Sequence, residues 1–110
     1  MNLNEKTAMV LELLDASDQD LDGKISTYLT IAKREILSWR YSYAPDSMPD
    51  DVPPEYEMTQ IQAVVMGYTH AGAEGEYLHN ENGINRHFTY ADMLEYIRKN
   101  VIPLAKVVIG

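Results

Sequence analysis

Residues 72–90 read GAEGEYLHNENGINRHFTY, and the interpretation of the chain depends on this stretch. Asn82-Gly83 predicts the two-residue turn of a β-hairpin, because a type I′ turn needs positive φ at both central positions and Asn-Gly tolerates it best. A two-stranded ribbon alone is only marginally stable in water. We therefore expect a hairpin near residues 76–89 that lies on another surface, either its own helices or a second copy of the chain.

The expected turn fixes which residues face each other across the hairpin. The predicted pairs are Glu81 with Ile84, His79 with Arg86, and Tyr77 with Phe88. Tyr77, Ile84 and Phe88 then share one face, and His79 and His87 point to opposite faces. The two histidines therefore cannot share a metal ion.

Around this hairpin the apolar residues recur at helical spacing, which predicts a mainly α fold: a small bundle of about four helices in a single domain, residues 1–110. The first helix is expected over 5–14, capped by Asn4, and the second over 20–41. The third is expected from Pro54 or Glu55, with Gly72 and Gly75 at its end. Its expected buried stripe is Met58, Ile61, Val64 or Val65, Tyr68 and Ala71. The fourth runs over 89–100 and opens with a variant of the capping box, Thr89 to Asp92.

Charge is unevenly distributed along the chain. No Lys or Arg occurs between Arg40 and Arg86, whereas that interval holds eight acids, which equals the whole net charge of −8. The loop over residues 44–54 contains four of the five prolines and three Asp, and it predicts an acidic crossover between helices. A surface built from this interval repels the phosphates of nucleic acids.

The run GAEGEYLHNENGINRHFTYADMLEYI, residues 72–97, resembles the signature of the head–tail connector (adaptor, head-completion) proteins of long-tailed bacteriophages and related prophages. In that family a helix ends in a Gly/Glu-rich turn, which is followed by an E-N-G-I-x-R hairpin and a short amphipathic helix. The order of the remaining elements also fits, so the resemblance extends over nearly the whole chain.

The resemblance implies a virion structural protein that joins the portal and filled head to the tail and extends the DNA exit channel. Its implied partners are further copies of itself in a ring of about a dozen subunits, the portal protein, and a tail-proximal stopper or head-closure protein. DNA passes through without specific binding, and no membrane is involved. The implied location is the head–tail junction of the virion, and the host cytoplasm during assembly.

Two segments are the expected assembly contacts, because strand addition and pocket filling both bury surface on a neighbour. The hairpin contributes Glu76, Tyr77, His79, Asn82, Gly83, Ile84, Arg86 and Phe88. The apolar C-terminal tail contributes Leu104, Val107, Val108 and Ile109. The tail either folds back on its own helices or docks on a neighbour.

A calcium-responsive or acidic helical binding module is the alternative. Six residues match positions 1, 3, 5, 6, 8 and 9 of an EF-hand loop, namely Asp18, Asp20, Asp22, Gly23, Ile25 and Ser26. Leu29, however, occupies position 12, where the loop needs a bidentate Glu. The acids are then better explained as caps of the second helix.

No catalytic, cofactor or metal site is expected. The chain has no Cys, no H-x-x-x-H or H-E-x-x-H spacing, no G-x-S-x-G and no phosphate-binding glycine loop. The N-terminal residues do not resemble a signal peptide, and no apolar run approaches the roughly 20 residues of a membrane span. The pattern therefore predicts a structural protein rather than an enzyme.

Overall fold

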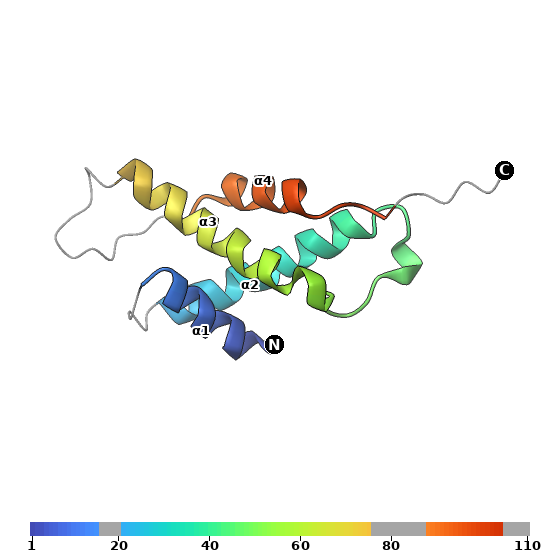
Figure 1. Ribbon diagram of the computed structural model, residues 1–110, viewed down its shortest axis with the longest axis horizontal. Coiled ribbons are helices and arrows are strands. Elements are labelled where there is room, and N and C mark those ends of the chain that lie inside the picture. Colours follow the sequence, from blue (N-terminus) through green and yellow to red (C-terminus); the bar gives the residue numbers. More distant parts are fainter. Residues whose placement is uncertain (16–20, 76–87, 105–110) are drawn as a thin grey trace.

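The structure is a computed structural model, and it describes residues 1–15, 21–75 and 88–104. This part is mainly helical and contains no strand. The helices are α1 (Leu3–Leu13), α2 (Asp22–Arg40), α3 (Glu57–Gly75) and α4 (Tyr90–Asn100) (Figure 1). The expected body of about four helices is confirmed. The expected β-hairpin, apart from its last two residues, lies outside the described residues.

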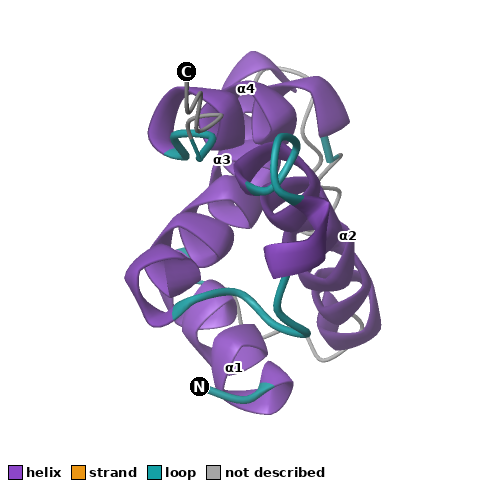
Figure 2. Ribbon diagram, turned by 90° about the vertical axis from the view of Figure 1, so that its right-hand side faces the viewer, coloured by secondary structure: helices purple, strands orange, loops and turns teal. Residues whose placement is uncertain are grey.

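Helices α2 and α3 form the centre of the bundle. Each of them contacts the other and both α1 and α4. Figure 2 shows the bundle turned by 90°, with only helices and loops in its described part. The buried side chains of all four helices join in one core, to which Val52 of the α2–α3 connection and Val101 after α4 also belong.

The core follows the helical periodicity of the sequence closely. In α2, Ile25, Leu29, Ala32 and Ile36 are completely buried. Their spacing of three or four residues places them on one face of the helix.

In α3 the predicted stripe is buried at Ile61, Val64 and Tyr68, but Met58 is 47% exposed. Met58 lies about 90° from the centre of that stripe on a helix of 3.6 residues per turn. Gln60, which the periodicity did not select, is buried instead.

Helix α1 begins two residues earlier than expected, and its N-cap is Asn2 rather than Asn4. The Glu5 N–H donates to Asn2 Oδ1, and the Asn2 N–H donates to Glu5 Oε1, each at 2.8 Å. A capping box needs its acid three residues after the cap, and Glu5 meets that condition only when Asn2 is the cap.

Helix α3 continues through Gly72 and ends at Gly75, one of the two glycines expected at its end. Its start differs from expectation, because a 3₁₀ turn, η3 (Pro54–Tyr56), precedes its α-helical part. Thr89 is the N-cap of α4, but its side chain makes no capping hydrogen bond. A second 3₁₀ turn, η2 (Pro45–Ser47), follows α2 within the proline-rich crossover.

Candidate assembly surface

Phe88, the last residue of the predicted hairpin strand, is held by its own subunit. Its ring stacks on Tyr28 of α2, with ring centroids 3.7 Å apart and planes 12° apart. It also meets Tyr68 of α3 edge-on, at a centroid distance of 4.9 Å. Aromatic pairs of this kind add about 0.5–1.5 kcal/mol each beyond the apolar area that they bury. The three rings therefore fasten the chain that leads into α4 onto the two central helices.

Gly67 of α3 makes room for this packing. If it carried a Cβ, that atom would lie only 2.6 Å from Phe88 Cζ, which is far inside van der Waals contact. The backbone carbonyl of Gly67 also accepts a hydrogen bond of 3.0 Å from the Thr89 N–H. The chain after the 76–87 segment is therefore attached to α3 through both its backbone and its side chain.

The Tyr68 side chain in this aromatic cluster is shielded from solvent. Its side chain is almost fully buried, and its hydroxyl finds no hydrogen-bond partner among the described residues. Burial, with a smaller contribution from Tyr28, raises the pKa of Tyr68 to about 12, because an ionised phenol is poorly solvated there. The hydroxyl has no acid–base role at neutral pH.

The C-terminal segment is fixed at the other end of the bundle, against the last turn of α2 (Figure 1). The Trp39 Nε1–H donates to the Val101 carbonyl at 2.9 Å. The Arg40 guanidinium donates to the Ile102 carbonyl at 2.6 Å, and the Arg40 carbonyl accepts from the Leu104 N–H at 2.8 Å. Three hydrogen bonds therefore determine where the tail leaves the body.

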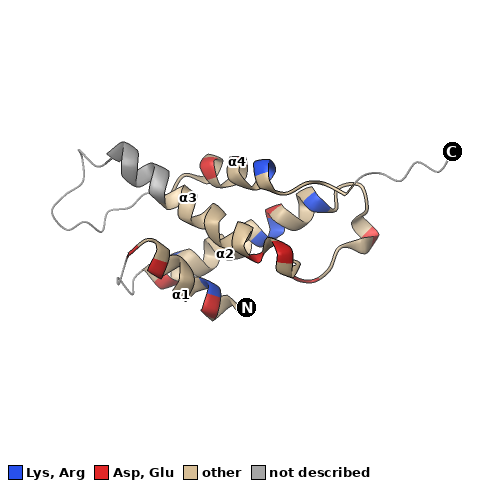
Figure 3. Ribbon diagram, in the orientation of Figure 1, with Lys and Arg blue, Asp and Glu red and all other residues tan. Residues whose placement is uncertain are grey.

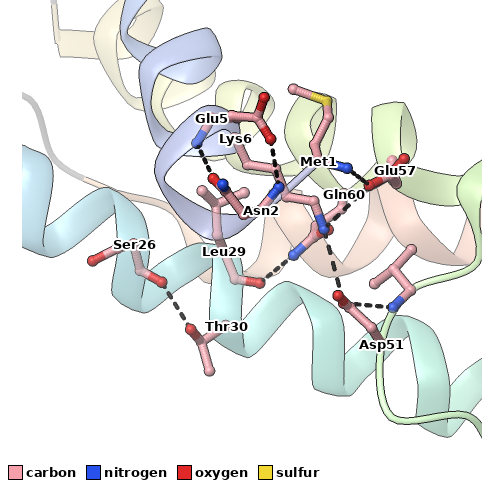
Figure 4. A network of polar contacts seen from close by, with 11 residues as sticks. Met1, Asn2, Glu5, Lys6, Ser26, Leu29, Thr30, Asp51, Glu57 and Gln60 are labelled. Atoms are coloured by element: carbon pink, nitrogen blue, oxygen red, sulfur yellow. Dashed lines mark hydrogen bonds and ion pairs between the residues drawn. The ribbon is translucent and has the colours of Figure 1, made fainter.

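A buried polar network joins α1 to α2 and α3 (Figure 4). Lys6 is only 3% exposed, and its Nζ donates to Gln60 Oε1 at 2.6 Å. Gln60 in turn donates to the Leu29 carbonyl at 2.8 Å. The carboxylates of Asp51 and Glu57 each lie 3.9 Å from Lys6 Nζ. A buried charge needs such partners, so this network fixes how α1 sits on the bundle.

Acidic side chains concentrate on the α2–α3 connection and the start of α3. Asp46, Asp50, Asp51 and Glu55 are exposed there, without any Lys or Arg in the same segment. Among the residues that the structure describes, Figure 3 shows Lys and Arg on α2 and α4, apart from Lys6 on α1. One part of the surface is therefore strongly acidic, as the sequence predicts.

The predicted hairpin and tail contacts are only partly described. Phe88 is the one described member of the hairpin set, and it packs within its own subunit; Leu104 is the one described member of the tail set. Glu76, Tyr77, His79, Asn82, Gly83, Ile84, Arg86, Val107, Val108 and Ile109 lie outside the described residues. The residues that hold the two segments were not singled out from the sequence. Gly67, as an isolated glycine inside a helical pattern, was a usable signal of a close approach.

The EF-hand interpretation places positions 5 to 9 of a calcium loop, residues 22–26, where the structure has the start of α2. Asp18 and Asp20, at positions 1 and 3, lie outside the described residues. Gly23 lies in the first turn of α2, whereas position 6 of a calcium loop makes a sharp turn. Its carbonyl accepts hydrogen bonds from the hydroxyls of Ser26 and Thr27. No group of three or more potential metal ligands occurs among the described residues.

Searches among protein families, curated proteins and solved structures found no match to this chain. Within the described part of the chain, no helix is both long and apolar enough to cross a membrane.

Proposed function

We propose that this chain is a virion structural protein of a bacteriophage or prophage, an adaptor that forms a ring beneath the portal and joins the head to the tail. One observation carries the proposal. Of the two segments expected to make assembly contacts, the first ends at Phe88, which packs on α2 and α3, and the second begins at Leu104, which is hydrogen-bonded to α2. The C-terminal ends of α3 and α2 lie toward opposite ends of the bundle (Figure 1).

Anchoring matters because an assembly contact is stronger when its geometry is set before binding. Phe88 is fixed on α2 and α3 by ring packing, and Leu104 is fixed on α2 by a backbone hydrogen bond. Contacts at two separate ends suit a heterologous interface, in which different surfaces of two copies meet. Such an interface generates a ring when the rotation between copies closes.

The acidic α2–α3 connection supports the passage of DNA without binding. Its exposed carboxylates repel phosphates, and the segment offers no Lys or Arg to release counterions from a duplex. In an adaptor ring, a surface of this kind at the channel lets DNA slide.

The proposal is tested by binding to the portal protein that the same genome encodes. The full chain should bind immobilised portal. A variant in which residues 77–87 are replaced by a short Gly/Ser linker keeps Phe88 and should retain its helical circular dichroism while losing portal binding. A variant with residues 77–87 scrambled is the matched control for length and composition. If the intact chain fails to bind the portal, the adaptor function is wrong.

A further inference from the structure

The two outer helices, α1 and α4, lie on opposite sides of the α2–α3 pair and are attached to it in different ways (Figures 1 and 2). The buried positions of α4 and of the residue that follows it are apolar: Met93, Ile97 and Val101. Hydrogen bonds also fix the chain on both flanks of α4. The Thr89 N–H donates to the Gly67 carbonyl before it, and the Val101 carbonyl accepts from α2 after it.

The buried side of α1 is half polar. Lys6 and Thr7 are buried there together with Val10, and Leu14 follows at the end of the helix. The Thr7 hydroxyl donates to a carbonyl of its own helix, so it adds no bond to the other helices. Among the described residues, the hydrogen bond from α1 itself to the body formed by α2, α3 and α4 is the one from Lys6 Nζ to Gln60 (Figure 4).

The Lys6 ammonium attaches α1 less firmly than an apolar side chain would. Its nearest partner, Gln60, is neutral, and the carboxylates of Asp51 and Glu57 lie 3.9 Å away, beyond hydrogen-bonding distance. Glu57 also accepts a hydrogen bond of 2.8 Å from the Met1 amino group. Such contacts offset the lost hydration of a buried charge but rarely exceed it. When α1 leaves the body, the ammonium regains its hydration, which favours the open state.

Detachment of α1 is also its unfolding. The helix has 11 residues, too few to remain helical in water without packing. Its backbone N–H groups therefore exchange with solvent whenever it leaves. The body keeps its own apolar contacts in that state, because α2, α3 and α4 all contact one another.

We infer that α1 is a releasable element, which detaches and unfolds in a local opening while α2, α3 and α4 stay packed, and that Lys6 sets how readily it does so. The inference goes beyond the adaptor proposal and does not depend on it, because it concerns the isolated chain. Release also changes the charge of the surface. Asp51 and Glu57 lose Lys6 as a counter-ion, so the acidic surface at the α2–α3 connection and the start of α3 becomes more negative.

Hydrogen exchange of the full chain, followed by mass spectrometry at neutral pH without denaturant, tests the local opening. After correction for intrinsic rates, the amides of α1 should exchange about a hundredfold faster than the buried amides of α3 and α4. Ile97→Val in α4 is the control variant, and it should speed exchange in α3 and α4 by up to about tenfold while leaving α1 unchanged. Equal rates in α1 and α3, or an acceleration of α1 by Ile97→Val in step with α3, would overturn the inference.

Two further variants test the part played by Lys6. Gln60→Leu leaves the ammonium without its closest partner and should speed exchange in α1 about a hundredfold, with α4 unchanged. Adding Lys6→Met to Gln60→Leu should slow exchange in α1 to the wild-type rate or below it. Unchanged protection of α4 and a helical circular dichroism spectrum show that the body is folded in both variants. If the double variant exchanges as fast as Gln60→Leu, Lys6 does not set the opening and the inference is wrong.

Discussion

The ring of Phe88 occupies the space that a side chain at Gly67 would need, and the backbone of the next residue, Thr89, donates to the Gly67 carbonyl. Two segments separated by 20 residues in sequence are thereby joined at one point of α3. The packing of α4 and the position of the chain that precedes it both depend on this contact.

We expect Gly67→Ala to destabilise the protein, although Ala favours a helix more than Gly does. Overpacking a core site costs about 1–3 kcal/mol, which exceeds the helix-propensity gain of about 1 kcal/mol. Gly23→Ala is the matched control, since its Cβ would meet no atom within 4 Å, and it should stabilise by about 0.5–1 kcal/mol. Urea unfolding of both variants measures the difference. Equal shifts of the same sign would contradict the role of Gly67.

The stacking of Tyr28 on Phe88 should appear as a coupling energy. Tyr28→Ala and Phe88→Ala each remove the stacked pair, so the double variant should lose less stability than the sum of the two single losses. The expected coupling is about 0.5–1.5 kcal/mol. The measurement is a double-mutant cycle by chemical unfolding. Additive losses would show that the two rings contribute independently.

Lys6 and Gln60 should behave as a coupled buried pair. Gln60→Leu leaves the Lys6 ammonium without its closest partner and should cost about 3 kcal/mol, because an uncompensated buried charge is expensive. Adding Lys6→Met to Gln60→Leu replaces the pair by apolar side chains of similar size, and it should restore most of the lost free energy of unfolding. If the double variant is no more stable than Gln60→Leu, the ammonium has access to water in the folded state.

Tyr68 should make stability depend on pH in the alkaline range. Its pKa is about 12 when folded, against 10.0 as the ordinary value. Its contribution is therefore fully present below pH 10 and is lost as the pH rises from about 10 through 12. Tyr68→Phe should remove this loss. It should also leave the protein at least as stable at pH 7, because the buried hydroxyl has no hydrogen-bond partner among the described residues.

The measurement compares wild type and Tyr68→Phe by unfolding at several pH values, together with absorbance titration of the eight tyrosines. The variant should lack one late-titrating phenol. A phenol at position 68 that titrates near pH 10 would show that the aromatic cluster is open to water.

The helical body was predictable because its signal is local and periodic. Ile25, Leu29, Ala32 and Ile36 recur at helical spacing, and all four are completely buried. The buried Lys6 was not predictable, because a lysine so early in an exposed helical pattern normally faces water. Its burial depends on Gln60 and Asp51, which are more than 40 residues away in sequence.

The anchors of the two candidate contact segments were missed for the same reason. Trp39 and Arg40 end the second helix, and nothing nearby in sequence indicates that they donate to the carbonyls of Val101 and Ile102. Gly67, as an isolated glycine in a helical pattern, indicated a close approach of another segment. Only the structure shows that this segment is Phe88. Contacts between residues far apart in the sequence, such as these, cannot be predicted from hydrophobic periodicity.

Quantitative mass spectrometry of purified phage particles tests the adaptor role most directly. Particles made by the virus or prophage that carries this gene should contain the chain in a molar amount close to that of the portal subunit, because stacked rings of an adaptor and a portal need comparable numbers of copies. Particles that contain the portal and tail proteins but lack this chain would contradict the proposal.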